Sequence, residues 1–134
     1  MGRPLNKRDK SIEKTVNEIL KSRAKSSIYT FLLRRNGARS DEIIKGTKLH
    51  PSTVREMLSK MYEQKLIYRK KIKNDSIGKN PYIYFAISPI SLLKQFTKEI
   101  EERLNIFASL PQTKNKGRSN RHVKIKIYER VNQK

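Results

Sequence analysis

The stretch that decides the fold covers residues 40–62 and reads SDEIIKGTKLHPSTVREMLSKMY. Ser40 suits the N-cap of a short helix that should extend to about Lys45, with acidic side chains in its first turn. A turn at Gly46-Thr47-Lys48 follows, and Pro51 then opens a second helix at its first turn. A short helix, a tight turn and a second helix in this order predict a helix-turn-helix.

The second helix of this motif has an apolar face and a polar face. Apolar residues recur at helical spacing and should anchor the helix in the core: Val54, Met57, Leu58, Met61 and Tyr62. Polar side chains share the other face, with which a helix-turn-helix reaches base edges and phosphates in the major groove: His50, Ser52, Thr53, Arg55, Glu56, Ser59 and Lys60. The alternative interpretation is a helix face that is merely exposed to solvent.

Glu56 is the exception on this polar face, because a carboxylate near phosphates costs free energy. It could accept a hydrogen bond from a cytosine amino group. Pairing with Lys60, one helical turn further along the same face, is the interpretation that we favour.

Upstream of the motif the chain changes from a basic arm to helical periodicity. We expect residues 1–10 to form a flexible arm whose cations add phosphate contacts: Arg3, Lys7 and Arg8. Apolar residues then recur at helical spacing over residues 12–32, and Lys21-Ser22-Arg23 either interrupts that helix or continues it. Asn36-Gly37 should cap its C-terminus, and Ala38-Arg39 is long enough only for a β-bridge.

Downstream of the motif, two strands enclose a segment of turn-forming residues. The stretch 66–73 begins as a strand, residues 74–80 favour a turn, and residues 81–87 return as an aromatic and β-branched strand. The cations of this hairpin, or wing, should contact phosphates or the minor groove: Arg69, Lys70, Lys71, Lys73 and Lys79. The alternative is a hydrophilic hairpin whose edge is protected by lysines.

A long helix over residues 90–110 should follow the hairpin, after the Ser88-Pro89 cap. It carries an apolar stripe at helical spacing: Leu93, Phe96, Ile100, Leu104 and Phe107. The stripe could simply close the core of the domain, but it is wider than a surface helix needs. We therefore expect a twofold dimer with this helix at the seam. Residues 111–134 form a basic tail, in which residues 122–128 alternate as a late strand or as a segment that orders on binding.

The overall composition indicates a polyanionic partner. Lysine and arginine number 32 against 12 aspartates and glutamates, which gives a formal net charge of +20 and a sequence pI of about 10.4. A charge of this size opposes compaction and is typical of nucleic-acid binding. A solvated, lysine-rich surface is the alternative interpretation. The length of 134 residues suits one compact domain with an accessory element.

The sequence offers no support for catalysis, metal binding or membrane insertion. It contains no cysteine, which excludes disulfides and cysteine-based zinc sites, and we expect no metal, cofactor or small-molecule ligand. Because no catalytic motif is present, we expect no enzyme. No apolar run reaches the roughly 18 residues that a membrane span requires, and no secretory signal opens the chain. We expect a cytoplasmic, nucleoid-associated protein.

Two segments resemble a known group of proteins. Residues 40–58 resemble the winged-helix transcription regulators of archaea and bacteria, and residues 78–89 are similar to the wing of the TrmB-like group. MarR-like and ArsR-like relatives share these motifs, and the resemblance covers roughly residues 24–110. It implies a recognition helix with these base-facing residues: Ser52, Thr53 and Arg55. TrmB-like regulators often carry a C-terminal sugar-sensing domain, which we do not expect because the chain ends too early for one.

These observations predict a mainly α fold of the α+β class: a winged helix-turn-helix over residues 11–89, with a long C-terminal dimerisation helix. The predicted function is a transcriptional regulator that binds double-stranded DNA as a homodimer. Two alternatives remain open. One is an architectural, chromatin-like protein that coats DNA without sequence specificity. The other is a winged helix that binds RNA or protein within a larger complex.

Overall fold

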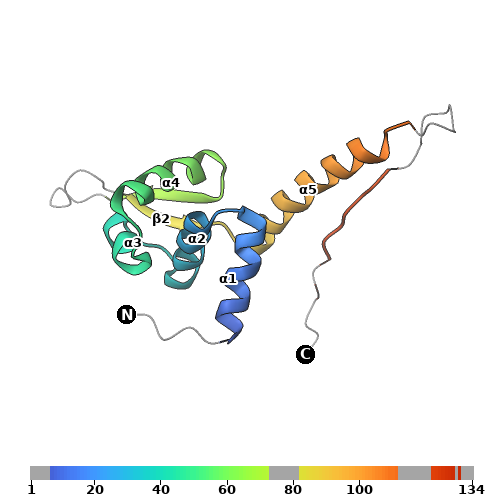
Figure 1. Cartoon of the computed structure of the whole chain (residues 1–134). Helices are drawn as coiled ribbons and strands as arrows, with labels where there is room; N and C mark the ends of the chain where they lie inside the picture. The colour runs from blue at the N-terminus through green and yellow to red at the C-terminus, as the bar shows by residue number, and fades with distance from the viewer. Residues whose placement is uncertain (1–6, 73–81, 112–121, 129, 131–134) are drawn as a thin grey trace. The chain divides into compact units, whose positions relative to one another are not determined.

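A computed structural model describes residues 7–72, 82–111, 122–128 and 130 of the chain, and these residues form helices and a β-hairpin (Figure 1). The elements in chain order are α1 (Lys7–Leu20), α2 (Arg23–Arg35), α3 (Ser40–Thr47), α4 (Pro51–Glu63), β1 (Ile67–Lys71), β2 (Tyr82–Ala86) and α5 (Pro89–Ala108). The chain divides into two compact units, Met1–Ser88 and Pro89–Lys134. The predicted fold class, mainly helical with a small hairpin, is confirmed.

Helix α1 begins at Lys7, so the prediction of a flexible arm over residues 1–10 is wrong for its last four positions. Asp9 explains the early start. Its side chain is buried, its Oδ1 lies 3.8 Å from Nη2 of Arg34 on α2, and its charge favours the positive end of the helix. Lys7 and Arg8 are therefore exposed residues of a helix, while Arg3 lies outside the described residues.

The open question at Lys21-Ser22-Arg23 is resolved as a break between two helices. Lys21 takes a left-handed conformation with φ of 54°, and the Oγ of Ser22 caps α2 by accepting the N–H of Lys25 at 3.2 Å. At the other end, Asn36 has φ of 55° and donates its N–H to the carbonyl of Leu32. The predicted cap at Asn36-Gly37 is thus confirmed.

Helix α3 differs from the prediction at both ends. Its N-cap is Arg39 rather than Ser40, because Oε1 of Glu42 accepts the N–H of Arg39 at 2.9 Å and satisfies the free donor there. The helix continues past Lys45 to Thr47 and ends where Lys48 takes φ of 60°. The predicted turn is therefore confined to the residues directly before α4.

Helix α2 forms the centre of the first unit and packs against α1, α3, α4 and β2. The core of this unit consists of apolar side chains from all of these elements: Val16, Ile28, Tyr29, Leu32, Ala38, Ile43, Val54, Leu58, Met61, Leu66, Ile67 and Tyr84. The hydroxyl of Tyr29 donates to the carbonyl of Ile87 at 2.7 Å. Burial raises the pKa of Tyr29 to about 12.

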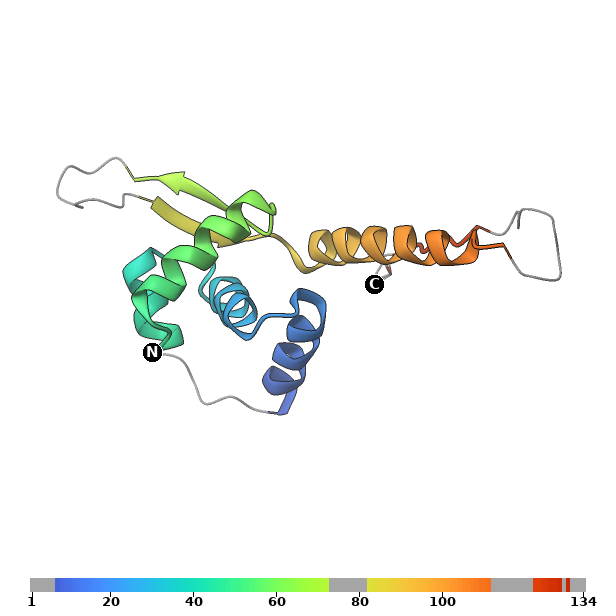
Figure 2. The same cartoon turned by 45° about the horizontal axis from the view of Figure 1, so that its top comes forward.

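The hairpin pairs β1 and β2 in antiparallel register, with Ile67 opposite Ala86 and Lys71 opposite Tyr82. Figure 2 shows the two strands alongside α4, and β1 packs against that helix. Ala38 adds a β-bridge to Tyr84, as the sequence predicts. The tip of the wing, residues 73–81, lies outside the described residues, and so do Lys73 and Lys79.

The second unit consists of α5 and an extended segment, residues 122–128. The helix ends at Ala108 rather than at the predicted Leu110. The side-chain amide of Asn105 pairs with both backbone groups of Val123, accepting its N–H at 2.6 Å and donating to its carbonyl at 3.0 Å. Oε2 of Glu101 accepts the N–H of Ile125 at 2.8 Å. Residues 122–128 do not form the late strand that was one of the two expectations, and their described partner is the helix α5.

Candidate nucleic-acid interface

Helix α4 begins with a cap that leaves His50 and Ser52 exposed. Nδ1 of His50 accepts the N–H of Ser52 at 3.2 Å and lies 2.7 Å from the Ser52 hydroxyl. Pro51 occupies the first turn, as predicted, where its missing N–H is not needed. The start of the helix therefore combines a partial positive charge with exposed polar side chains, an arrangement that suits an anion.

The structure leaves most of the predicted polar face of α4 exposed. The exposed members are His50, Ser52, Arg55, Glu56, Ser59 and Lys60. Thr53 is half-buried. On the opposite face, Val54, Leu58 and Met61 are at most 3% exposed. A helix anchored in this way holds its polar side chains in a fixed orientation.

Glu56 and Lys60 form an ion pair with an Nζ–Oε1 distance of 3.1 Å. This confirms the pairing that the sequence favours over contact with a base. Because both side chains are exposed, the pair contributes little to stability. Its effect is to reduce the negative charge that Glu56 would otherwise place on the polar face of α4.

Tyr62 is not an inner-face residue of α4, and that part of the prediction is wrong. It directly follows the buried Met61, so its side chain lies about 100° further around the helix than that of Met61, at the margin of the buried face. It is 42% exposed, and the guanidinium carbon of Arg69 lies 4.1 Å from the centre of its ring. Tyr62 therefore belongs to the surface where α4 faces the wing.

The described cations of the wing lie on both faces of the hairpin. Arg69 stacks over Tyr82 as well as Tyr62, at 4.3 Å from the Tyr82 ring centre. Lys70 lies over the ring of Phe85 on the other face, at 5.5 Å. Lys71 is exposed at the end of β1. Only the Arg69 face of the hairpin is thus brought together with α4.

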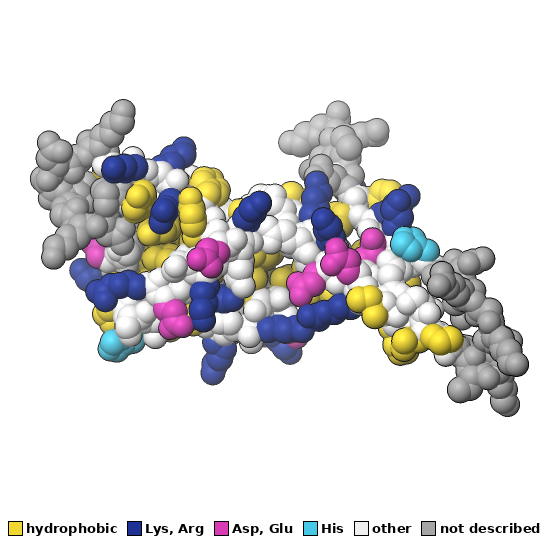
Figure 3. All heavy atoms as spheres, turned by 90° about the horizontal axis from the view of Figure 1, so that it is seen from above, with side chains coloured by type: hydrophobic (Ala, Val, Ile, Leu, Met, Phe, Trp, Pro, Cys, Tyr) yellow, Lys and Arg dark blue, Asp and Glu magenta, His cyan; other side chains and the backbone are white. Residues whose placement is uncertain are grey.

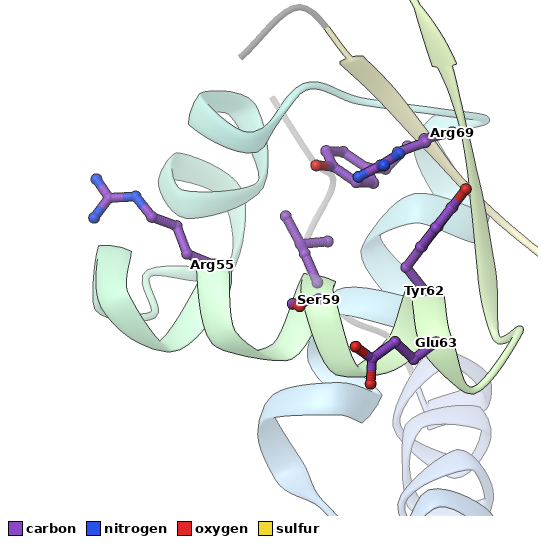
Figure 4. Close-up of a pocket in the computed structure, with 7 residues that line it drawn as sticks. Arg55, Ser59, Tyr62, Glu63 and Arg69 are labelled. Carbon is purple, nitrogen blue, oxygen red and sulfur yellow. The ribbon is translucent and has the colours of Figure 1, made fainter. Parts of the chain in front are cut away.

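A hollow of 260 Å³ lies between α4, β1 and the buried Tyr84 of β2 (Figure 4). Its lining residues are Arg55, Leu58, Ser59, Tyr62, Glu63, Arg69 and Tyr84. In Figure 4, Arg69 and Tyr62 face each other at one side of the hollow, while Arg55 extends away from it. The sequence identified Arg55, Ser59 and Arg69, but it did not identify Tyr62 or Glu63 as parts of one site.

Basic side chains outnumber acidic ones on the face of the molecule shown in Figure 3. Several acids are already paired with cations, which lowers their repulsion of an anion. Glu42 pairs with Arg35 at 2.8 Å, and Glu99 pairs with Arg103 at 3.1 Å. The surface therefore retains the cationic character that the net charge of +20 predicts.

Two negative findings hold for the part of the chain that the structure describes. None of its helices is long and apolar enough to cross a membrane. None of its histidine and acidic residues gather into a group that could hold a metal ion.

One solved structure has a similar fold at low sequence identity, and a second is less similar. A possible transcriptional regulator from Methanosarcina mazei Go1 is 22% identical, with 72% of this chain and 84% of that chain covered and a TM-score of 0.56. The S. aureus MepR–DNA complex matches at 18% identity, with 78% of each chain covered and a TM-score of 0.43. A search of curated protein sequences gave no match.

A family model assigns the chain more directly. The model of the TFIIE alpha subunit family matches residues 12–108, which include most of α1 and every other helix and strand of the described structure. The predicted winged helix-turn-helix of a transcription regulator is confirmed. Proteins of this kind are not enzymes, in agreement with the prediction. The chain belongs to the TFIIE alpha subunit family and has the winged-helix fold of transcription regulators.

Proposed function

We propose that this protein is a transcriptional regulator that binds duplex DNA through α4 and the wing. The observation that carries the proposal is the division of α4 into two faces. Val54, Leu58 and Met61 fix the helix in the core, while the face with Ser52 and Arg55 stays exposed. A helix held in this way can enter a major groove without rearrangement of the domain.

The proposed contacts fall into base readout and phosphate binding. On the recognition helix we assign base and backbone contacts to His50, Ser52, Thr53, Arg55, Ser59 and Lys60, while Glu56 stays paired with Lys60 on the same face. Phosphate or minor-groove contacts are assigned to Arg69, Lys70 and Lys71, and to Lys73 and Lys79 of the wing tip. The N-terminal cations Arg3, Lys7 and Arg8 add further phosphate contacts.

Selection from random duplex DNA at two salt concentrations tests this proposal. We expect an enriched motif, and we expect Arg55→Ala to lower the ratio of specific to random-DNA affinity by about 1–3 kcal/mol, about 5- to 150-fold. Arg23→Ala is the matched control, because Arg23 is exposed on α2, outside the proposed interface. An unchanged ratio for Arg55→Ala would remove Arg55 from base readout.

The proposed functional form is a homodimer joined through α5. The apolar stripe supports this proposal, because Phe107 is 73% exposed, Leu104 is 40% exposed and Leu93 is 37% exposed. Phe96 and Ile100, between them on the same stripe, are half-buried. A second copy would cover these side chains and place two recognition helices on successive half-sites.

Sedimentation of charge variants tests the dimer. Leu104→Glu with Phe107→Glu should yield a monomer with an unchanged helix content. Ile106→Glu is the control, because Ile106 is 69% exposed on the same helix but lies on a different side from the stripe. If the Leu104→Glu/Phe107→Glu variant and Ile106→Glu dissociate equally, the dimer contact lies elsewhere on α5. If the unaltered chain sediments as a monomer, the dimer proposal is wrong.

The net charge and the family favour two other candidate functions. A charge of +20 also suits an architectural protein, which would bind all duplexes tightly, enrich no motif and lose affinity steeply with salt. The family is named after the alpha subunit of TFIIE, and a subunit role favours a winged helix that binds RNA or protein within a larger complex. Preference for structured RNA over duplex DNA, or isolation with a stable protein partner, would support that function.

A further inference from the structure

Arg69 is held in an unusual environment for an exposed cation. Its guanidinium lies over Tyr62 from α4 at 4.1 Å and over Tyr82 from β2 at 4.3 Å. Among the described residues, no carboxylate lies within ion-pair distance of it, whereas Arg35, Arg39 and Arg103 all have acidic partners. Two rings thus position Arg69 while leaving its charge for an anion from outside the described structure.

The hollow beside Arg69 has the size and donors for a tetrahedral anion. Its volume is 260 Å³, and Ser59 contributes a hydroxyl to its lining. Arg55 also lines the hollow, with its guanidinium extending away from it (Figure 4). Glu63 is the acidic lining residue among those described, and Figure 4 shows its carboxylate on the side of the hollow away from Arg69. The charge balance of the lining therefore favours an anion at the Arg69 side.

We propose that this hollow binds one phosphate group of the DNA backbone, with Arg69 as a forked donor and Tyr62 and Tyr82 as positioning residues. A guanidinium can give two parallel N–H donors to phosphate oxygens, which fixes orientation as well as charge. The two ring contacts restrict the long side chain before DNA arrives, so less conformational entropy is lost on binding. This inference rests on the proposed function and names the contact that sets the register between α4 and the wing.

The test compares the affinities of variants for a random-sequence duplex of about 20 base pairs over a range of salt concentrations. Arg69→Gln should reduce the slope of log K against log salt by about 0.9, which is the loss of one phosphate contact. Arg69→Lys keeps the charge but not the fork, so it should keep the slope and lose affinity about threefold to tenfold. Arg23→Gln is the matched control and should change neither quantity.

The tyrosines are tested by paired substitutions with and without an aromatic ring. Tyr62→Leu and Tyr82→Leu should each weaken duplex binding about twofold to tenfold, while Tyr62→Phe and Tyr82→Phe should bind as the unaltered chain does. Circular dichroism and the unfolding midpoint of each variant report whether the fold is intact. Equal losses for the Leu and Phe variants would overturn the positioning role of the rings.

The remaining outcomes separate the two proposals. An unaltered chain without affinity for duplex DNA would overturn both the function and the phosphate site. If the chain binds duplex DNA tightly, and Arg69→Gln has the same affinity and the same salt slope as Arg23→Gln, the phosphate site is overturned while the proposed function stands. If millimolar inorganic phosphate shifts the Nε–H resonance of Arg69 while Arg69→Gln leaves duplex binding unchanged, the hollow binds a free anion. That outcome would also overturn the DNA-phosphate proposal.

Discussion

The two units of this protein differ in how far their apolar side chains are buried. In the winged-helix unit, apolar side chains from all four helices and both strands are buried in one core. In α5, Leu92 is buried, while Leu104, Ile106 and Phe107 are at least 40% exposed. The first unit thus buries most of its large apolar residues within one chain, whereas α5 leaves several of them exposed.

The largest expected effect comes from truncating the same residue type in each unit. Ile28 on α2 is 0% exposed, whereas Ile106 on α5 is 69% exposed. Ile28→Ala should lower the free energy of unfolding by about 2–5 kcal/mol, because it removes buried methyl groups and leaves a cavity. Ile106→Ala should change it by less than about 0.5 kcal/mol. Urea unfolding followed by circular dichroism measures both.

Equal costs for the two isoleucine substitutions would contradict the contrast between the units. A large loss for Ile106→Ala that grows with protein concentration would show that a second copy buries Ile106, since unfolding of a dimer depends on concentration.

A substitution in α3 tests how tightly the first unit is packed. Replacing an exposed helical glycine by alanine usually stabilises a helix by about 1 kcal/mol. At Gly46, however, an added Cβ would collide with the ring of Phe31. We therefore expect Gly46→Ala to lower the free energy of unfolding by about 1–3 kcal/mol. The double variant Gly46→Ala with Phe31→Leu should recover part of that loss, and a stabilised Gly46→Ala would contradict the close packing.

The sequence predicted those parts of the fold that depend on local signals. The spacing of Val54, Leu58 and Met61 identified the buried face of α4, and Asn36-Gly37 identified the end of α2. Both signals act within one or two helical turns, where side-chain periodicity and backbone conformation are set by neighbouring residues. Pairing of Glu56 with Lys60 was predictable for the same reason.

The features that the sequence did not predict depend on contacts between distant segments. The start of α1 at Lys7 depends on Asp9 reaching Arg34 of α2. The position of Tyr62 depends on Arg69 crossing from β1 to meet its ring. No local pattern specifies either contact, because each partner lies on an element whose place is fixed only by the complete core.

The hydroxyl of Tyr29 provides a smaller, pH-dependent test of the first unit. Tyr29→Phe removes the 2.7 Å hydrogen bond to the carbonyl of Ile87 and should cost about 0.5–1.5 kcal/mol near neutral pH. The pKa of Tyr29 is about 12 in the folded chain, against an ordinary value of about 10. A raised pKa means that the folded chain holds this proton more tightly, so the stabilisation is complete below pH 10 and is lost as the pH rises towards 12.

The comparison of the unaltered chain with Tyr29→Phe isolates this effect from the titration of lysines, which both proteins share. The difference in the free energy of unfolding should be constant up to about pH 10 and should narrow above it. A difference that widens with rising pH would contradict the assignment, because it would mean that folding favours the ionised phenol.

The smallest effect on overall stability is expected at Asn105, where the second unit holds its extended segment. Its amide makes both hydrogen bonds to Val123, and the side chains of Val123, Ile125 and Ile127 are only half-buried. Asn105→Ala should therefore leave the unfolding of the winged-helix unit unchanged within about 0.5 kcal/mol and accelerate amide exchange at Val123 and Ile125. Ser109→Ala is the control, because Ser109 directly follows α5 and its hydroxyl donates to the carbonyl of Ile106 on that helix. Unchanged exchange in Asn105→Ala would mean that apolar contacts alone hold the segment, whereas a loss of stability in the winged-helix unit would mean that the two units do not unfold independently.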